Sequence, residues 1–184
     1  MPAYSAQAKI GKVDGMISPV FEKPVPGVLR IDAQHGFAYP ALDLMMEHLP
    51  DMARSQGIAI ASIHRSHHAG VMGLTVERLA EQGLAAMMFA NAPAAMAAWG
   101  GRRPMFGTNP IAFGVPVGDA GDPIIIDLAL SKVARGKIMA ARQKGAEIPD
   151  DWALDVDGNG TVDHDEFREG MKALKVALSA AQIE

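Results

Sequence analysis

The chain has 184 residues, of which 49% are hydrophobic and 21% are charged, and its formal net charge is −4. This length is sufficient for one compact domain with its own core, while the acidic balance offers no basic surface to a nucleic acid. The absence of cysteine excludes disulfides, thiolate zinc sites and cysteine nucleophiles.

The first 27 residues are interrupted by four prolines and three glycines, and we predict an extended arm over residues 1–27. They lack the basic-then-apolar build of a signal peptide. No part of the chain approaches about 18 continuous apolar residues, the length of a membrane-spanning helix. We therefore expect a cytoplasmic protein without a membrane partner.

Strand-like and helix-like patterns alternate over residues 28–150, where we predict an α/β domain. One helix follows Pro40, with Gly57 as its stop signal and Pro50 expected to kink or divide it. The predicted elements, in chain order, are strand Val28–Ala33, helix 40–57, strand Ile58–Ile63, helix Met72–Gln82, strand Leu84–Ala92, strand Pro123–Leu130 and helix Lys132–Lys144.

The strand Pro123–Leu130 has three consecutive isoleucines, which leave neither face polar. This pattern predicts a strand that is buried on both faces. The segment before it, which contains GTNPIAF, is interpreted as a glycine-rich connection.

A candidate binding loop follows Ile63 and contains His64, Ser66, His67 and His68. Connecting loops of α/β proteins commonly present binding groups, and imidazoles can donate hydrogen bonds to a phosphate or move a proton near neutral pH. The alternative is a set of surface or helix-capping residues. A metal site is less favoured, because no nearby carboxylate completes a ligand pattern.

Two further segments are candidates for binding a substrate. Thr108, in the turn Gly107–Pro110, can hold a carboxylate or carbonyl together with backbone amides, although turn composition alone explains these residues equally well. Asp127 ends a strand, and Arg135 could clamp a carboxylate with two hydrogen bonds. Gly136 inside a helix costs about 1 kcal/mol relative to alanine, which suggests close approach of a ligand. A solvated basic face is the alternative.

Several motifs together resemble the malate/L-lactate dehydrogenase-like family in order and spacing, over roughly residues 4–165. They are SHHAGVMG, WGG, FGTNPIAFGVP, PIIIDLALSKVARGK and IPDDWALD. The resemblance implies an α/β fold with a mixed sheet, flanking helices and a nucleotide-binding domain that is not a Rossmann fold, consistent with the lack of a GxGxxG fingerprint. It also implies a homodimer that transfers a hydride between NADH or NADPH and a small-molecule 2-oxo acid, 2-hydroxy acid or cyclic imino acid.

The same resemblance implies which residues carry these roles. The cofactor would be lined by His68, Ala69, Gly70, Val71, Met72, Asp127, Leu128 and Ala129. The substrate would be contacted by Thr108, Arg135 and Gly136, while Lys137 stands at a position that is a catalytic aspartate in some members. The family's catalytic histidine lies in an SHG motif, which this sequence lacks, and its downstream lysine–glycine motif is also missing. We therefore expect a shortened member that does not turn over substrate by itself.

Residues 155–166, DVDGNGTVDHDE, fit the twelve-position calcium loop of an EF-hand, and a helix is expected after them. The oxygen ligands would come from Asp155, Asp157, Asn159, Thr161, Asp163 and Glu166. Against calcium binding, the dehydrogenase family has a similar surface segment here, Pro149 leaves at most a short entering helix, and the loop is single. We predict a third segment, 151–184, that holds this loop and a helical carboxy terminus.

Two alternatives to an NAD(P)-dependent enzyme remain open at this point. One is a calcium-binding EF-hand-like module on a catalytically inactive dehydrogenase fragment. The other is a noncatalytic fragment that persists by association, because a shortened sheet would expose strand edges and apolar surface.

Overall fold

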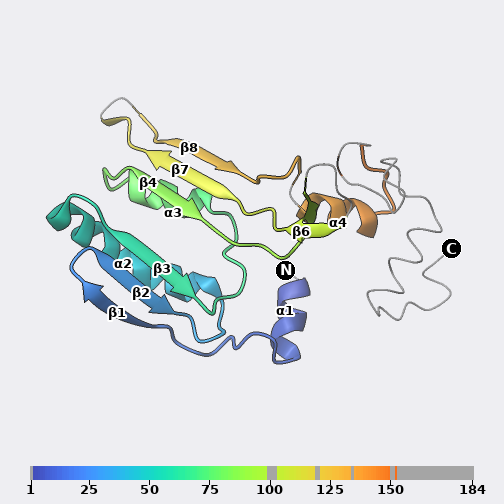
Figure 1. The fold of residues 1–184 in the computed structure, drawn as a ribbon, viewed down its shortest axis with the longest axis horizontal. Helices are drawn as coiled ribbons and strands as arrows, with labels where there is room; N and C mark the ends of the chain where they lie inside the picture. The colour runs from blue at the N-terminus through green and yellow to red at the C-terminus, as the bar shows by residue number, and fades with distance from the viewer. Residues whose placement is uncertain (1, 99–102, 119–120, 134, 150–151, 153–184) are drawn as a thin grey trace. The chain divides into compact units, whose positions relative to one another are not determined.

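The computed structural model describes residues 2–98, 103–118, 121–133, 135–149 and 152 (Figure 1). The chain divides into two compact units, which we describe separately. Unit 1 comprises Met1–Ala90 and Pro110–Leu128, and unit 2 comprises Asn91–Asn109 and Ala129–Glu184. Among the helices of the described ranges, none has the length and apolarity needed to cross a membrane.

Unit 1 contains two three-stranded sheets, the first packed against helix α2 and the second against helix α3 (Figure 1). Its elements are α1 (Pro2–Lys9), β1 (Val20–Val25), β2 (Val28–Asp32), α2 (Ala38–Gln56), β3 (Ile60–His64), α3 (Gly73–Ala80), β4 (Ala86–Phe89), β7 (Ile111–Val115) and β8 (Ile124–Leu128). The described part of unit 2 holds β5 (Met96–Ala97), β6 (Pro104–Phe106) and α4 (Arg135–Gln143).

The first sheet has the strand order β1-β2-β3. Strands β2 and β3 are parallel, with Asp32 at the end of β2 opposite His64 at the end of β3, and α2 makes the crossover between them. Strand β1 pairs antiparallel with β2 and lies at the edge. Leu29 and Ile31 of β2 are fully buried in the core cluster that includes α2. This βαβ unit therefore supplies the main core of unit 1 and brings two strand ends together.

Helix α2 forms as the apolar spacing predicts, because one of its faces is buried against the sheet. Gly57 ends the helix in the left-handed conformation, with φ of 80°. The helix continues through Pro50 as one element and is not divided. Met45 and Met52, on either side of the proline, are both buried in the same core cluster, which keeps both halves on the sheet.

The second sheet is antiparallel, with the order β4-β7-β8, and helix α3 covers one of its faces. Val76 of α3 packs with Met72 and Ala112 in a second core cluster. Gly114 of β7 allows this close approach, because a Cβ there would lie 2.8 Å from the backbone oxygen of Val76.

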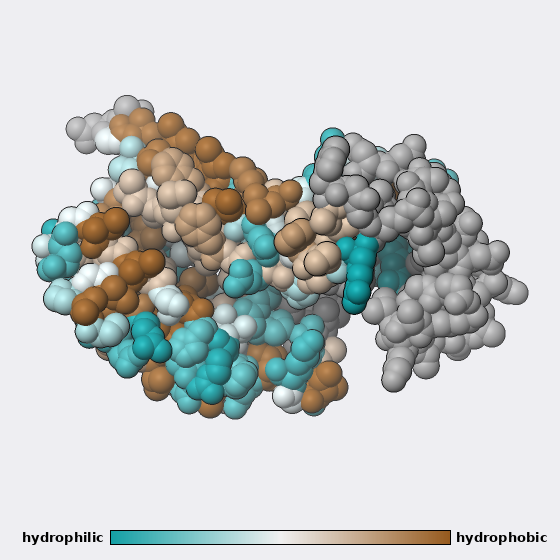
Figure 2. Space-filling model, in the orientation of Figure 1, coloured by the Kyte–Doolittle hydropathy of each residue, from teal (hydrophilic) through white to brown (hydrophobic). Residues whose placement is uncertain are grey.

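The other face of this second sheet is apolar in the described part of the chain, exposed along β4 and β8 and half-buried along β7. The side chains on it come from alternate positions of the three strands, in register: Met87, Phe89, Ile111, Phe113, Val115, Ile124, Ile126 and Leu128. Figure 2 shows hydrophobic residues gathered along β7 and β8. The prediction that Pro123–Leu130 is buried on both faces is wrong for the described residues, since Ile124 is 56% exposed and β8 pairs only with β7.

Two predicted irregular segments contain regular structure. The expected extended arm, residues 1–27, holds helix α1 and strand β1, and β1 carries Pro24 at the edge of its sheet, where a proline is tolerated. The glycine-rich connection that contains GTNPIAF includes β7, the central strand of the second sheet. The mixed α/β character is as predicted from the alternating patterns, while the division at residues 27 and 150 stays a prediction.

Candidate functional site

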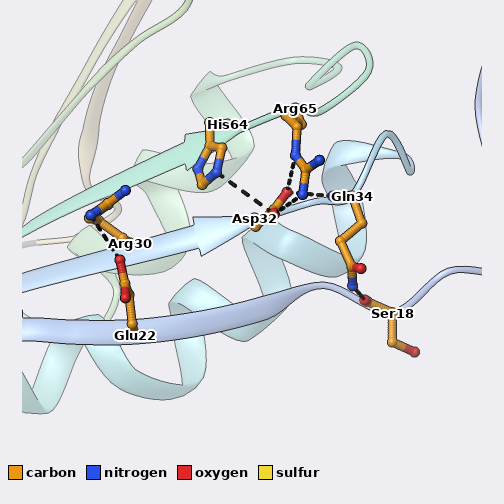
Figure 3. A network of polar contacts seen from close by, with 7 residues as sticks. All are labelled: Ser18, Glu22, Arg30, Asp32, Gln34, His64 and Arg65. Atoms are coloured by element: carbon orange, nitrogen blue, oxygen red, sulfur yellow. Dashed lines mark hydrogen bonds and ion pairs between the residues drawn. The ribbon is translucent and has the colours of Figure 1, made fainter.

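The candidate loop, residues 65–72, joins the carboxyl end of β3 to helix α3. It begins at Arg65, whose guanidinium pairs with the carboxylate of Asp32 at the end of the neighbouring parallel strand (Figure 3). Nε of Arg65 lies 2.9 Å from Oδ1 of Asp32, and a second guanidinium nitrogen contacts Oδ2. The backbone N–H of Gln34 donates to the same carboxylate at 2.8 Å. The carboxyl ends of parallel strands are where α/β proteins commonly bind ligands.

These contacts change the acidity of both partners. The hydrogen bond from Arg65, together with that from the Gln34 backbone, lowers the pKa of Asp32 from its ordinary 3.8 to about 2. The same hydrogen bond with Asp32 raises the pKa of Arg65. Both partners are therefore ionised throughout the neutral range. Nε2 of His64 lies 3.8 Å from Oδ2 of Asp32, on the other side of the carboxylate.

The middle of the loop is held by ring contacts. His67 packs edge-on against Phe37, with ring centroids 5.7 Å apart, and its Nε2 pairs with the side chain of Gln7 from α1. Burial, followed by the nearby charges of His68 and Lys12, lowers the pKa of His67. An imidazole whose pKa is lowered is neutral at neutral pH, so His67 is suited to hydrogen bonding rather than to charge pairing.

The next residues are those predicted to line a cofactor. The backbone N–H of Gly70 donates to Nδ1 of His68 at 2.8 Å, so the ring proton of a neutral His68 lies on Nε2. Val71 is 62% exposed, whereas the Met72 side chain is buried in the second core cluster. The loop thus presents His68 and Val71 at the surface, while Met72 fixes its end in the core.

Asp127, on strand β8 of the second sheet, contacts the residue that follows the 68–72 loop. Its Oδ2 accepts a 2.7 Å hydrogen bond from the backbone N–H of Gly73, the first residue of α3. A carboxylate at a helix amino terminus satisfies a free N–H group and interacts favourably with the helix dipole. The structure therefore brings Asp127 beside the carboxyl end of the 68–72 loop, while a shared cofactor-binding role stays a prediction. Leu128 follows it at the exposed end of β8.

The predicted substrate turn lies in unit 2 and is tightly packed. The carbonyl of Thr108 accepts a 2.8 Å hydrogen bond from the backbone N–H of Leu130, so the turn lies beside the segment that contains Ala129. Oδ1 of Asn109 accepts a hydrogen bond from the N–H of Ala92 at 3.0 Å. A Cβ on Gly107 would lie 2.1 Å from the carbonyl oxygen of Ala92, so only glycine fits there.

The remaining substrate candidates lie at the start of helix α4. Arg135 is its first residue, and Gly136 and Lys137 follow it, both exposed. A Cβ on Gly136 would meet no atom within 4 Å, so packing within the described residues does not require glycine at this position. Open space at Gly136 fits both contact with a ligand or partner and a solvated helix face, so the ligand role stays a prediction.

The predicted calcium loop, with Asp155, Asp157, Asn159, Thr161, Asp163 and Glu166, lies outside the described residues, as does the predicted helical carboxy terminus. Within the residues that the structure does describe, no group of three or more histidine, aspartate or glutamate side chains is placed to hold a metal ion.

Sequence reasoning missed Asp32 and Arg65, which are 33 residues apart. A signal was present, because each is at or just beyond the end of a predicted strand in one βαβ unit, and parallel strands bring such ends together. The packing of Tyr39 against Gly70 carried no comparable signal. A Cβ on Gly70 would lie 2.5 Å from the Tyr39 hydroxyl, a contact between a helix and a loop that no spacing predicts.

Comparisons with known proteins show which family this chain is similar to. A family model described as malate/L-lactate dehydrogenase matches residues 1–180. The (2R)-3-sulfolactate dehydrogenase (NADP(+)) of Chromohalobacter salexigens is 52% identical over 166 residues, which cover 90% of this chain and 49% of that protein. The delta(1)-pyrroline-2-carboxylate/delta(1)-piperideine-2-carboxylate reductase of Pseudomonas putida is 41% identical over 170 residues, covering 92% and 50%. The chain spans about half the length of these curated relatives.

Solved structures give the same result for the fold. The delta1-piperideine-2-carboxylate reductase of Pseudomonas syringae aligns with a TM-score of 0.70 at 40% identity, over 83% of this chain and 48% of that one. A dehydrogenase of Sinorhizobium meliloti aligns with a TM-score of 0.81 at 30% identity, over 88% and 47%. The described architecture therefore recurs in longer proteins of known structure.

Proposed function

The chain belongs to the malate/L-lactate dehydrogenase family, and on that premise we propose that it takes part in hydride transfer between NAD(P)H and a 2-oxo acid, a 2-hydroxy acid or a cyclic imino acid. The observation that carries this proposal is the similarity to two kinds of relative, one named as an NADP+-linked hydroxy-acid dehydrogenase and one as a cyclic imino-acid reductase. Both are similar over at least 90% of this chain.

The proposed cofactor site is the 68–72 loop together with Asp127, Leu128 and Ala129. The hydrogen bonds from Gly70 to His68 and from Gly73 to Asp127 support it, since they order the loop and the start of the helix that follows it. Preorganised loops bind with a smaller entropic cost. The nucleotide supplies the hydride when it is bound, and the residues of this chain bind and orient it. We propose that this nucleotide-binding domain is not a Rossmann fold.

The proposed substrate site is Thr108 with Arg135 and Gly136, and we assign Lys137 to the catalytic position. The packed turn around Thr108 supports the first part, because its contacts fix the backbone that carries the Thr108 side chain. The family's SHG histidine has no counterpart in residues 1–184, so we assign no proton donor here. By the same resemblance we propose a homodimer. We also propose a cytoplasmic location and, from the net charge of −4, no binding to nucleic acid.

Isothermal titration of the 184-residue chain with NADPH, and separately with NADH, tests the cofactor proposal. We expect NADPH to bind, because the relative with 52% identity is named for NADP+. Turnover is then followed by nicotinamide absorbance with (2R)-3-sulfolactate and with delta(1)-pyrroline-2-carboxylate. If neither nucleotide binds, the proposed function is wrong for this chain.

Gly136→Ala is expected to raise the free energy of unfolding by about 1 kcal/mol, because alanine favours the helix and meets no neighbour. If Gly136 contacts the substrate, the same change lowers substrate affinity. Urea unfolding and a substrate titration measure the two effects.

Gly83→Ala is the matched control for stability. A Cβ there also meets nothing within 4 Å, but Gly83 has φ of +79° in the turn after α3, so alanine should lower the unfolding free energy by about 1 kcal/mol. If Gly136→Ala destabilises the chain as Gly83→Ala does, α4 is not a helix in solution.

We also propose weak calcium binding by residues 155–166, a function of a different class. The ligand spacing supports it, with four carboxylates among the six proposed ligand residues, which repel one another without a cation. A single loop with a poor entering helix should bind with a Kd on the order of 10⁻⁴ M or weaker. Titration calorimetry with calcium measures this, and Glu166→Ala should abolish the signal. An unchanged affinity in Glu166→Ala would reduce the motif to a surface turn.

A further inference from the structure

Two neighbouring turns in unit 1 hold non-glycine residues in the left-handed backbone region. Gln34 and His35, after β2, have φ of 52° and 64°, and Arg65, after β3, has φ of 51°. Such conformations cost energy for residues with a Cβ and persist only where surrounding contacts enforce them. They tend to occur at functional sites, and here the second turn opens the proposed cofactor loop.

Backbone hydrogen bonds join the two turns. The N–H of His35 donates to the carbonyl of Arg65 at 2.7 Å, and the N–H of His67 donates to the carbonyl of Gly36 at 2.9 Å. The side chain of Asp32 connects the same turns a second time, because one carboxylate accepts from the Gln34 backbone and from Arg65 (Figure 3). One side chain therefore holds both strained turns.

We propose that Asp32 is a positioning residue, whose pairing with Arg65 holds the 65–72 loop in the conformation that binds the nicotinamide nucleotide. The cofactor part rests on the function proposed above. Asp32 suits the task because its side chain is only 18% exposed, so the pair is shielded better than the surface ion pairs. Its pKa of about 2 keeps it charged at every pH where an enzyme of this kind would be assayed.

Asp32→Asn is the informative variant, since asparagine is nearly isosteric and can still accept the Gln34 hydrogen bond but carries no charge. Glu22→Gln is the matched control. Glu22 also pairs with an arginine of the first sheet, Arg30, at 2.8 Å, but both of these side chains are more than half exposed and neither touches the loop (Figure 3).

Hydrogen exchange of the His35 and His67 amides tests the ordering of the loop without any ligand. We expect Asp32→Asn to speed exchange at both amides by about tenfold or more, and Glu22→Gln to leave them unchanged. Equal exchange in wild type and Asp32→Asn would overturn the proposal.

NADPH titration tests the link to the cofactor. We expect Asp32→Asn to weaken binding by about tenfold and Glu22→Gln to have no effect. Faster exchange with unchanged NADPH affinity would overturn the positioning role. If the wild type binds neither nucleotide, the proposed function and the cofactor part of this inference both fail, and the exchange result alone then decides whether Asp32 orders the loop.

Measuring the free energy of unfolding across a pH series tests the charge of Asp32, because an uncharged contact would not make stability change with pH in this range. Asp32 has a lowered pKa in the folded chain, so its contribution to stability is present above pH 4 and is lost as the pH falls from about 4 to about 2. The charged or titratable groups that face it are the Arg65 guanidinium and the His64 imidazole. The wild type should have a higher free energy of unfolding than Asp32→Asn above pH 4, and this difference should disappear as the pH falls from about 4 to about 2. A difference in unfolding free energy between the two proteins that does not change with pH would contradict an ionic role.

Discussion

Replacing Gly107 with alanine is expected to lower the free energy of unfolding by about 3 kcal/mol, the upper part of the range for overpacking. The added Cβ would lie 2.1 Å from the carbonyl oxygen of Ala92 and 2.4 Å from Oδ1 of Asn109. The first of these is backbone, which cannot rotate away, so the turn that carries Thr108 must move. Substrate affinity should therefore fall together with stability.

Urea unfolding monitored by circular dichroism measures the first effect, and a substrate titration measures the second. Thr108→Ala is the control, because it removes the hydroxyl and the γ-methyl group and adds no heavy atom. Its effect on stability should stay within about 1 kcal/mol, while substrate affinity falls if the hydroxyl makes the contact. A Gly107→Ala protein that unfolds at the wild-type urea concentration would show that the turn is not packed as described.

Gly70→Ala is expected to weaken NADPH binding by tenfold or more. Gly70 has φ of +74°, where alanine costs about 1–2 kcal/mol, and its Cβ would lie 2.5 Å from the hydroxyl of Tyr39. Tyr39 is 45% exposed and can turn away, so the clash displaces a side chain while the backbone strain remains. The loop would then leave the conformation in which the Gly70 N–H donates to His68.

Gly118→Ala separates the effect on binding from the effect on folding. Gly118 also has a positive φ, of +65°, and a Cβ there meets nothing within 4 Å. We expect both variants to lose about 1 kcal/mol of stability, but only Gly70→Ala to lose nucleotide affinity, as measured by calorimetry. Equal NADPH affinity for wild type and Gly70→Ala would remove the 68–72 loop from the proposed site.

Local sequence patterns were sufficient to predict those helices and strands whose own residues favour the observed structure. The helical spacing in α2 and its glycine stop, and the branched residues of β2, predict structure that neighbouring residues along the chain already favour. Strands β1 and β7 were not predicted. One contains a proline and the other a glycine, and both become strands because a partner strand supplies their hydrogen bonds.

The sequence alone determined the family resemblance, the candidate loop and the order of the elements from β2 to β4, because motifs and periodicity are properties of neighbouring residues. Only the tertiary structure decided which distant residues meet: the side chains of Asp32 and Arg65, 33 residues apart, and the Asp127 carboxylate with the backbone N–H of Gly73, 54 residues apart. It also decided the exposure of β8, whose isoleucines indicate an apolar strand but not what covers it. Burial depends on the layer that packs against a strand, and no local pattern contains that layer.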